Sequence, residues 1–517
     1  MTAGPLSDQS PDDSGDLWPM DPTYEPDGGL RALTHCDADW SGLIVVVVGL
    51  GLSGFASADA LLKRGATVTV VSRDQTAVML ERTQILTVRG ANVLFGDAVP
   101  AAASTGTQLV ITSPGVLPNN PFLAAAADAG VPVWGEVELA WRMRAREGAA
   151  PWLTVTGTNG KTTVVTMLET ILCTAGLRVT AAGNIGLPIL EAVLHSEPYD
   201  VLAVELSTFQ LHWSRSVSAY ASCLLNVTPD HLDWHGSFTK YRYMKGRIFE
   251  RTQVAAIYNV QDEATERLLE QAEVVDGCRA VGFTLATPAP SMVGLVDDVL
   301  ADRAFVSNRQ RNVVELASLV DLRGPADVNP FPHVVANALA AGALARAYGV
   351  EPIAVRDGLR AYQPQAHRVA TVASIVGVHY VDDSKATNPA AAASLAMFGQ
   401  VVWIAGGLLK GTDVEELVWS VRERLRGVVL IGRDRAQIAR ALRRHAPDVP
   451  VFDIASAETG AMNEAVRVAS ELAHFGDVVL LAPAAAATDM FDSYAARGDA
   501  FTAAVHVLSE GGAHECY

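Results

Sequence analysis

The chain has 517 residues, half of them hydrophobic and 19% charged, with a formal net charge of −18 at pH 7. This length predicts two to four domains with large apolar cores. The negative charge argues against broad binding to nucleic acid or anionic membranes, and no stretch reaches the roughly 20 consecutive apolar residues of a membrane span. We therefore expect neither nucleic acid nor membrane as a partner.

The N-terminal residues, MTAGPLSDQSPDDSGDLWPMDP, are acidic and rich in Pro and Ser. They carry neither the basic nor the apolar segment of a signal peptide, and we interpret residues 1–40 as a disordered acidic extension. The five cysteines are dispersed without a C-x-x-C pair. Such a set is a poor disulfide framework and favours a reducing, cytoplasmic location.

The first folded segment opens with LIVVVVGLGLSG, residues 43–54. Its G-x-G-x-x-G predicts a buried strand, a tight turn and a helix whose N-terminus can bind a diphosphate. A helical pattern and the strands ATVTVVS, ANVLFG and LVITSPG follow, which is typical of a parallel α/β sheet. The pattern alone leaves the ligand open, because a dehydrogenase would use the same loop and Asp74 lies about 20 residues downstream as a nominal ribose ligand.

A second glycine-rich loop lies in TVTGTNGKTTVVTMLETIL, residues 154–172, which reads as strand, loop and helix. Its backbone amides and the helix N-terminus can bind phosphate oxygens. Lys161 can neutralise β/γ-phosphate charge and Thr162 can bind Mg²⁺. The loop is G-x-x-G-K-T, with Val155 where the pattern G-x-x-x-x-G-K-[ST] has its first glycine. Because the match is imperfect, the alternative interpretation is a Gly-containing turn with a surface lysine.

A bound triphosphate requires metal ligands near this loop. AVELSTFQL places Glu205 and Ser207 at the end of an apolar strand. LNVTPDHLDWHG follows the next strand with Asp230, His231, Asp233 and His235. The carboxyl ends of parallel strands meet at one edge of a sheet, where ligands bind. For His231 alone, a metal ligand and a hydrogen-bonded structural histidine are equally good interpretations, whereas Asp233 and His235 favour a structural role.

The rest of the chain is again α/β in pattern. The central segment extends to about residue 360 and includes a less regular, proline-containing stretch at residues 276–330. A third segment contains the strands GVHYVDDS, VVWIAGG, GVVLIG and DVVLLAP with helix-like segments between them. We therefore predict three α/β domains, at residues 41–149, 150–360 and 361–517.

An ordered series of motifs resembles the Mur ligase family of ATP-dependent amide-bond-forming enzymes over roughly residues 41–510. The motifs are TGTNGKTT, GNIG (183–186), ELSTFQL (205–211), LNVTPDHLDWHG (225–236), YRYMKGRIF (241–249), H-x-x-x-N (333–337), HR (367–368), DDSKATNP (382–389) and RGDAF (497–501). DSKATN, SPG at 113–115 and the short N-terminal domain bring the chain closest to members that add D-glutamate to UDP-N-acetylmuramoyl-L-alanine in peptidoglycan precursor synthesis.

The resemblance implies a Rossmann-like N-terminal domain that binds UDP, a central P-loop ATPase domain, and a Rossmann-like C-terminal domain that brings the amino acid. It also implies two chemical steps. The substrate carboxylate attacks the γ-phosphate of ATP to give an acyl phosphate, and the amine of D-glutamate then displaces phosphate. The protein would mainly align the reactants and neutralise charge. A cytoplasmic monomer without other partners is expected.

The resemblance also assigns roles to individual residues. The catalytic set is Lys161, Glu205, His231, Lys245 and Lys385. The ATP contacts are Gly157, Thr158, Asn159, Gly160, Lys161, Thr162, Thr163, Asn337, Arg368 and Asp383. The UDP contacts are Gly51, Leu52, Ser53, Ser72, Arg73 and Asp74, and the muramoyl contacts are Asn184 and Ser207. The D-glutamate contacts are Thr387, Lys410, Thr488 and Tyr494.

Two Mg²⁺ sites are implied, one at Thr162 and Glu205 and one at His231 and Lys245. The family carbamoylates the lysine at the Lys245 position, which makes chemical sense because a protonated amine cannot bind Mg²⁺. From the residues alone, Lys245 would read as a solvated helix lysine.

Two positions depart from the family pattern. Val334 replaces the first Asn of H-N-x-x-N, and Ala487 replaces a serine that helps to hold D-glutamate. Three alternative functions are a dehydrogenase, an amide ligase that acts on another amino acid or on folate, and a non-catalytic nucleotide-binding scaffold. A dehydrogenase leaves the second glycine loop unexplained, and the complete set of catalytic side chains argues against a scaffold.

Overall fold

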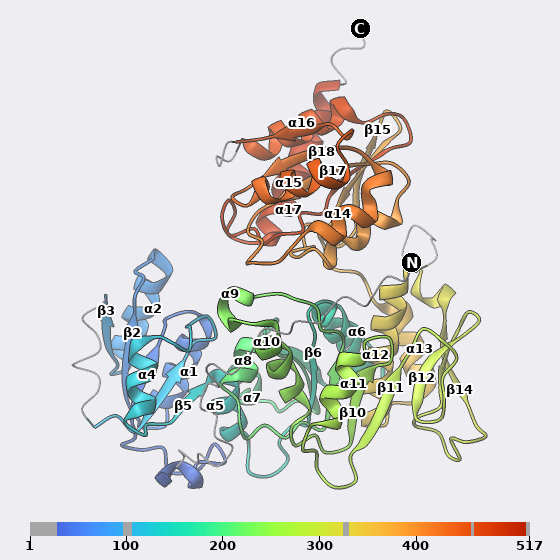
Figure 1. Cartoon of the computed structure of the whole chain (residues 1–517). Coiled ribbons are helices and arrows are strands. Elements are labelled where there is room, and N and C mark those ends of the chain that lie inside the picture. Colours follow the sequence, from blue (N-terminus) through green and yellow to red (C-terminus); the bar gives the residue numbers. More distant parts are fainter. Residues whose placement is uncertain (1–27, 97–105, 324–329, 456–459, 513–517) are drawn as a thin grey trace, which may run out of the picture. The chain divides into compact units, whose positions relative to one another are not determined.

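The computed structural model describes residues 28–96, 106–323, 330–455 and 460–512 (Figure 1). The chain divides into two compact units, residues 1–147 and 148–517. The first unit contains one β-sheet and the second contains two. All three sheets are mainly parallel, which confirms the α/β class predicted from the sequence.

The sheet of the first unit is entirely parallel, in the order β3-β2-β1-β4-β5. Its strands are β1 (Ile44–Val48), β2 (Thr67–Ser72), β3 (Asn92–Phe95), β4 (Leu109–Thr112) and β5 (Val133–Gly135). Its helices are α1 (Leu52–Leu62), α2 (Ala77–Val88), α4 (Pro121–Asp128) and α5 (Glu136–Arg142).

The G-x-G-x-x-G loop of this unit packs strand and helix closely together. Gly49, just after β1, has a φ of 95°, a region that favours glycine. A Cβ atom on Gly54 would lie 1.9 Å from the Gly49 carbonyl oxygen, so only glycine fits there without a backbone shift. The predicted strand, turn and helix are therefore confirmed.

The segment before β1 is folded from residue 28 onward. Gly28–Ala32 forms a short 3₁₀-helix, η1, and the side chains of Leu33 and Trp40 are buried. The prediction of disorder is thus wrong for residues 28–40, because a few apolar side chains in a polar segment are enough to pack it on the domain. Residues 1–27 lie outside the described residues.

The central sheet has the order β14-β13-β12-β11-β10-β9-β6-β8-β7. Its strands are β6 (Trp152–Thr156), β7 (Val179–Gly183), β8 (Val201–Glu205), β9 (Ala221–Leu224), β10 (Ala255–Asn259), β11 (Arg279–Phe283), β12 (Met292–Val296), β13 (Val299–Asp302) and β14 (Val314–Ser318). Its helices are α6 (Lys161–Thr174), α7 (Ile189–Val193), α8 (Thr208–His212), α9 (Leu232–His235), α10 (Phe238–Gly246), η2 (Arg247–Phe249), α11 (Glu263–Glu270), η3 (Leu319–Leu322), α12 (Pro332–Tyr348) and α13 (Pro352–Ala361).

The stretch expected to be less regular, residues 276–330, carries strands β11 to β14 in its described part. β12, β13 and β14 form an antiparallel ribbon at the sheet edge, with Leu295 opposite Leu300. Each of these strands has only four or five residues, and prolines occupy the loop between β11 and β12. Strands this short give little period-two signal in the sequence, which explains why the expectation was wrong.

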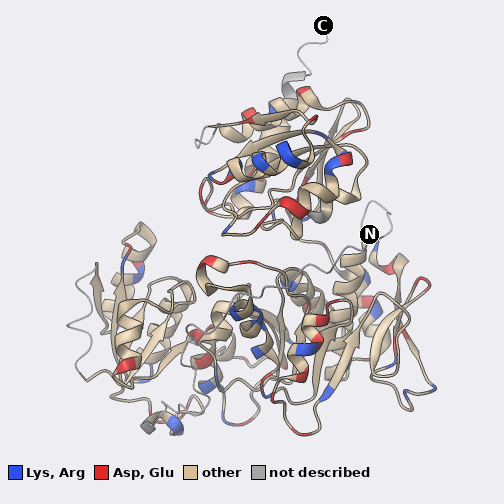
Figure 2. Ribbon diagram, in the orientation of Figure 1, with Lys and Arg blue, Asp and Glu red and all other residues tan. Residues whose placement is uncertain are grey.

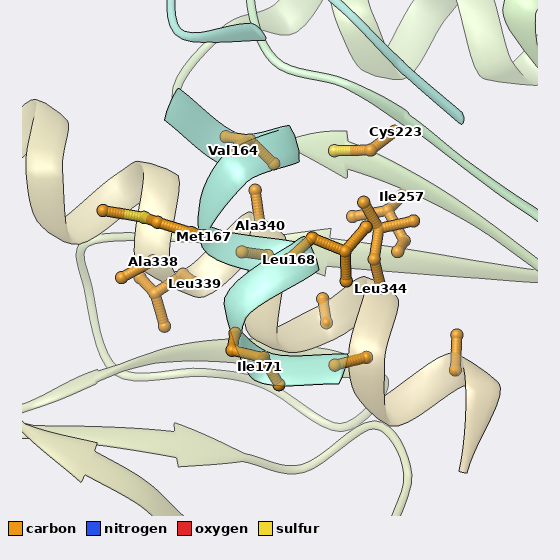
Figure 3. Packing of buried hydrophobic residues seen from close by; sticks show 14 of the residues in the cluster. Val164, Met167, Leu168, Ile171, Cys223, Ile257, Ala338, Leu339, Ala340 and Leu344 are labelled. Carbon is orange, nitrogen blue, oxygen red and sulfur yellow. The ribbon is translucent and has the colours of Figure 1, made fainter. Parts of the chain in front are cut away.

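An apolar core holds the helix that follows the second glycine loop (Figure 3). Val164 and Leu168 of α6 lie with Ala340 and Leu344 of α12, and Cys223 of β9 lies beside them. The small alanines of α12 allow its backbone to approach α6, and each fully buried leucine contributes roughly 1.5–3 kcal/mol to the free energy of folding. The first turns of α6 are therefore anchored in the apolar core of the domain.

The third sheet has the order β15-β16-β20-β17-β18-β19, with only β15 antiparallel to its neighbour. Its strands are β15 (Ala370–Ile375), β16 (Val378–Asp382), β17 (Val401–Gly406), β18 (Leu425–Ile431), β19 (Val451–Asp453) and β20 (Val478–Leu481). Its helices are η4 (Ala391–Met397), α14 (Glu415–Val421), η5 (Arg422–Arg424), α15 (Arg435–His445), α16 (Ala461–Leu472) and α17 (Tyr494–Gly512).

Candidate active site

The glycine-rich loop between β6 and α6 has the conformation expected of a phosphate-binding loop. Gly160 precedes α6 with a φ of 86°, and a Cβ atom there would lie 2.6 Å from Oδ1 of Asn337. The backbone N–H of Asn159 donates to Asn226 Oδ1 at 2.9 Å, and Asn226 Nδ2 donates to the Asn159 carbonyl at 3.1 Å. The loop is thus fixed at the N-terminus of a buried helix, where anions bind favourably.

Two lysines converge on the carbonyl oxygen of Gly157. Lys161 Nζ donates to it at 2.9 Å and to the Thr158 carbonyl at 2.9 Å. Lys245 Nζ, from α10, donates to the same Gly157 oxygen at 2.7 Å and is 2% exposed. Lys245 is therefore not the solvated helix lysine that its residue type alone suggests, because the fold carries it into the site from 88 positions away.

Burial lowers the pKa of both lysines. For Lys245 the pKa lies well below its usual value, because of burial first and the positive charge of Lys161 second. Burial likewise lowers the pKa of Lys161, while the carboxylates of Glu205 and Asp230 oppose that effect. The depressed pKa of Lys245 increases the fraction of its amine that is neutral and nucleophilic, whereas the two carboxylates favour the charged form of Lys161.

Glu205 stands at the end of β8 beside these lysines, 1% exposed. Its Oε1 accepts a hydrogen bond from Asn184 Nδ2 at 2.8 Å. Its Oε2 is buried without a hydrogen-bond partner among the described residues. A buried carboxylate oxygen is costly to leave unpaired, so this atom is suited to accept a cation or a hydrogen-bond donor. The hydroxyl of Ser207, two residues on, caps α8 through Gln210.

His231 lies at the start of α9 in the left-handed region, with a φ of 52°. Its backbone N–H donates to Asp230 Oδ1 at 2.9 Å, and its Nε2 lies 3.4 Å from Lys410 Nζ. Burial, opposed by Asp230 and supported by Lys410, lowers the pKa of His231 to about 4. The imidazole is therefore neutral at pH 7, as a metal ligand must be.

An aromatic and histidine cluster, which the sequence interpretation did not anticipate, surrounds His231. Phe209 packs edge-on against it, with ring centroids 4.9 Å apart, and also contacts Trp234 at 4.7 Å. His212 packs edge-on against Trp234, with ring centroids 5.3 Å apart, and burial lowers the pKa of His212 to about 3. His235 is buried and shares a hydrogen bond with Thr208, in line with the structural role favoured for it. Phe209, His212, Trp234 and His235 thus form an aromatic wall beside the imidazole.

The loop after β16 carries several of the predicted side chains. Burial raises the pKa of Asp383 to about 7, and burial together with the charge of Arg368 lowers the pKa of Lys385 to about 8. Lys385 Nζ lies 3.7 Å from the ring centroid of Tyr494. Arg368 Nε is buried without a hydrogen-bond partner among the described residues. Lys385 and Arg368 are electrostatically coupled to Lys161, so the second and third sheets contribute to one charged site.

The remaining predicted contacts to the amino acid lie on loops of the third sheet. Lys410, in the left-handed region with a φ of 53°, places Nζ 3.8 Å from Asp230 Oδ1. The Thr387 N–H donates to the Lys385 carbonyl at 2.8 Å. Thr488 is exposed beside the buried Ala487. These positions lie on the loops after β16, β17 and β20, whose carboxyl ends share one edge of the sheet.

The predicted UDP contacts lie in the first unit, at the carboxyl ends of two paired parallel strands. Gly51, Leu52 and Ser53 begin α1, with Leu52 66% exposed. Ser72 is the last residue of β2, and Arg73 and Asp74 follow it; Ser72 Oγ donates to the Asp74 carbonyl at 3.1 Å. The Oγ of Ser113 is buried there without a partner among the described residues. The SPG motif was noted in the sequence without a role for this hydroxyl.

Arg497, from the RGDAF motif, is a second residue whose place the sequence did not reveal. It is 1% exposed. Its guanidinium donates to Ser384 Oγ at 3.0 Å, to the Ser384 carbonyl at 2.9 Å and to the Ala485 carbonyl at 3.1 Å. It therefore ties two loops at the carboxyl edge of the sheet together, and only its position in a recurring motif could have drawn attention to it.

The charged side chains of the described residues do not form an evident metal-binding cluster. Figure 2 shows Lys and Arg interspersed with Asp and Glu along the ribbon. Within the described ranges, no group of three or more His, Cys, Asp and Glu is arranged to hold a metal ion. The predicted metal positions contain only Glu205 and His231 of these types, so a metal there would need hydroxyl or modified-lysine ligands. None of the described helices is long and apolar enough to span a membrane.

Comparison with known proteins places three family profiles along the chain. The Mur ligase MurD-like N-terminal domain matches residues 44–135, the Mur ligase middle domain matches residues 155–345, and the Mur ligase glutamate ligase domain matches residues 367–485. Together the profiles cover all three sheets in the order in which they follow along the chain.

Two relatives of high identity carry the same description. A UDP-N-acetylmuramoylalanine–D-glutamate ligase of Streptomyces avermitilis is 57% identical over 471 residues, covering 91% of this chain and 99% of its own length. Its counterpart in Mycolicibacterium smegmatis is 43% identical over 531 residues, covering 96% and 99%.

Solved structures share the fold at low identity. A UDP-N-acetylmuramate–alanine ligase from Thermotoga maritima has a TM-score of 0.52 at 19% identity, covering 90% of this chain and 99% of its own. A pseudomurein peptide ligase from Methanothermus fervidus has a TM-score of 0.54 at 16% identity, with the same coverages.

Proposed function

The chain belongs to the Mur ligase family, and on that premise we propose that it is an ATP-dependent ligase that adds D-glutamate to UDP-N-acetylmuramoyl-L-alanine in peptidoglycan precursor synthesis. The observation that carries this function is the high identity to ligases of that description over nearly their whole length. The alternatives of a dehydrogenase and of a nucleotide-binding scaffold have no such support.

The site residues fit the two steps of such a reaction. First, the carboxylate of the muramoyl-L-alanine attacks the γ-phosphorus of ATP, ADP leaves, and an acyl phosphate forms. Lys161, at the N-terminus of α6, neutralises charge on the β- and γ-phosphates. Second, the amine of D-glutamate attacks the acyl carbon, inorganic phosphate leaves, and the amine loses a proton. Lys385 lies close enough to couple electrostatically with Lys161 and stabilises the transferred phosphate.

Magnesium is proposed at two positions, and the residues present fit it. Thr162 and the unpartnered Oε2 of Glu205 would hold one ion. His231, neutral at pH 7, and Lys245 as its carbamate would hold the other. When bound, Mg²⁺ supplies charge neutralisation for the phosphates. The depressed pKa of Lys245 supports carbamoylation, because only a neutral amine adds to carbon dioxide and the carbamate then offers oxygen ligands.

The substrate contacts are proposals that rest on the family resemblance and on the positions described above. UDP is proposed to lie against Gly51, Leu52 and Ser53 at the start of α1 and against the segment 72–74. Asn184 and Ser207 are assigned to the muramoyl group. ATP is assigned to residues 157–163 with Asn337, Arg368 and Asp383. D-Glutamate is assigned to Thr387, Lys410, Thr488 and Tyr494.

We further propose domain boundaries near residues 149 and 360, a cytoplasmic location and a monomeric enzyme. The dispersed cysteines support a reducing compartment. The division of the chain after residue 147 supports the first boundary, and the family profiles leave a gap from 346 to 366 around the second. Size-exclusion chromatography with light scattering would measure the oligomeric state, and a dimer mass would overturn the monomer.

The function is tested by phosphate release with ATP, UDP-N-acetylmuramoyl-L-alanine and a panel of D- and L-amino acids. Release that depends on both the muramoyl substrate and D-glutamate is expected. Release driven by another amino acid, or by a folate in place of the UDP-sugar, would transfer the chain to a different branch of the family. Mass spectrometry of the product should show one added glutamyl residue per UDP-sugar.

A further inference from the structure

Two asparagine side chains, 229 positions apart in the sequence, form a reciprocal amide pair. Asn159 of the phosphate-binding loop donates from Nδ2 to Asn388 Oδ1 at 3.3 Å, and Asn388 Nδ2 donates to Asn159 Oδ1 at 3.0 Å. Asn388 is only 4% exposed. Asn388 is the last residue of the segment DDSKATN, and the sequence motifs assigned it no role. The pair is a direct link between the loop after β6 and the loop after β16.

The neighbouring hydrogen-bonding groups determine the orientation of the Asn388 side-chain amide. Its Oδ1 also accepts the backbone N–H of Ala391 at 2.8 Å, and its Nδ2 also donates to Asp230 Oδ2 at 3.3 Å. Because a backbone N–H can only donate and a carboxylate can only accept, the opposite orientation would lose both contacts. Both ends of the Asn388 amide are therefore used, and its two N–H groups face Asn159 and Asp230.

Each loop of the pair is held independently on its own side. The Asn159 backbone is bound at both its N–H and its carbonyl by Asn226. On the other side, Thr387 precedes Asn388, and the Lys385 N–H donates to the His367 carbonyl at 3.1 Å. The amide pair thus joins two loops that each have hydrogen bonds of their own, and it forms only when those loops meet.

We propose that Asn388 is a positioning residue that couples the ATP-binding loop to the loop delivering Lys385 and Thr387, so that the site for D-glutamate is aligned with the site for ATP. This inference rests on the proposed function. Asn388 itself need not touch any substrate. Its hydrogen bond to Asp230 extends the coupling to the segment that carries His231. The Asn388 side chain therefore links its own loop to the loops that carry Asn159 and Asp230.

This role predicts a specific kinetic pattern. Without the pair, fewer enzyme molecules hold the two loops in the aligned arrangement. We therefore expect kcat/KM for D-glutamate to fall about tenfold or more, which is the loss expected for two hydrogen bonds. The affinity for ADP should change by less than about threefold, because Asn226 still holds the phosphate-binding loop.

The test compares Asn388→Ala and Asn388→Asp with Asn463→Ala, an exposed position on α16 of the same domain. Aspartate is nearly isosteric with asparagine but cannot donate, and it would place a carboxylate against Asp230. The aspartate variant should therefore lose at least as much kcat/KM as the alanine variant, while Asn463→Ala keeps the wild-type value. If Asn388→Asp retains wild-type kcat/KM for D-glutamate, Asn388 only fills space and the proposal is wrong.

A double-mutant cycle with Asn159→Ala separates coupling from independent effects. If the two side chains act through each other, the double variant loses no more kcat/KM than the worse single variant, whereas multiplied losses would overturn the proposal. The wild-type protein, the two single alanine variants and the double variant are also unfolded in urea. Their free energies of unfolding give the coupling free energy of the pair without an activity assay. A wild-type enzyme that releases no phosphate with D-glutamate refutes the proposed function, and the urea cycle then still decides whether the pair is coupled.

Discussion

Replacing Lys245 with alanine tests the least obvious part of the proposed site. In the wild-type protein the Lys245 amine is buried and donates to the Gly157 carbonyl at 2.7 Å. If its carbamate holds Mg²⁺, the variant loses one preorganised charged group at the phosphates. Losses of this kind are typically 10²–10³-fold in rate, or roughly 3–4 kcal/mol of transition-state stabilisation. We therefore expect kcat for phosphate release to fall by at least about 100-fold.

The free energy of unfolding should change far less than the rate. The Gly157 carbonyl keeps its hydrogen bond from Lys161 at 2.9 Å, so the variant loses one hydrogen bond, at a cost of about 1 kcal/mol. Removal of a buried, desolvated amine offsets part of that cost. Urea denaturation should therefore show a loss of no more than about 2 kcal/mol, which distinguishes a damaged site from a damaged fold.

Chemical rescue identifies which form of the lysine acts. Acetate can occupy the space of the missing side chain and supply carboxylate oxygens, so it should restore part of the activity of Lys245→Ala, whereas ethylamine should not. Lys240→Ala, a partly exposed position on the same helix, serves as the matched control and should keep wild-type activity. Near wild-type turnover by Lys245→Ala, or rescue by ethylamine alone, would refute the carbamate.

Lys161→Ala should lower phosphate release by at least about 100-fold while circular dichroism shows an unchanged fold, since the lysine neutralises the transferred phosphate; retained turnover would contradict that role. Gly54→Ala should destabilise the protein by roughly 1–3 kcal/mol, because its Cβ would meet the Gly49 carbonyl at 1.9 Å, whereas Gly115→Ala, with nothing within 4 Å, should melt like the wild type. Burial holds the pKa of His212 near 3 in the folded state, so the unfolded state binds more protons below pH 6.5 and stability is lost as the pH falls towards 3. His212→Gln should therefore reduce the loss of unfolding free energy between pH 7.5 and 4.5 by about 2–3 kcal/mol; an unchanged pH dependence in urea denaturation would show that His212 is not the group responsible.

Local patterns were enough to place the strands that carry the site. The run LIVVVVGLGLSG became β1 and α1, and TVTGTNGKTT became β6, a loop and α6. Each of these signals is contained in about a dozen consecutive residues, and strand ends in a parallel sheet necessarily share an edge. Two segments were exceptions. Residues 28–40 fold through the buried Leu33 and Trp40, and the stretch 276–330 carries strands β11 to β14, which are too short to give a clear pattern.

By itself, the sequence determined the α/β class, the phosphate-binding loop and, through ordered motifs, the family and the reaction. Only the tertiary structure decided that Lys245 is buried against Gly157, that His212 is held neutral in an aromatic wall, and that Asn159 and Asn388 pair across 229 positions. The physical reason is that burial, pKa shifts and hydrogen bonds between loops depend on which surfaces meet when the sheets are packed. A pattern of neighbouring residues in the chain does not contain that information.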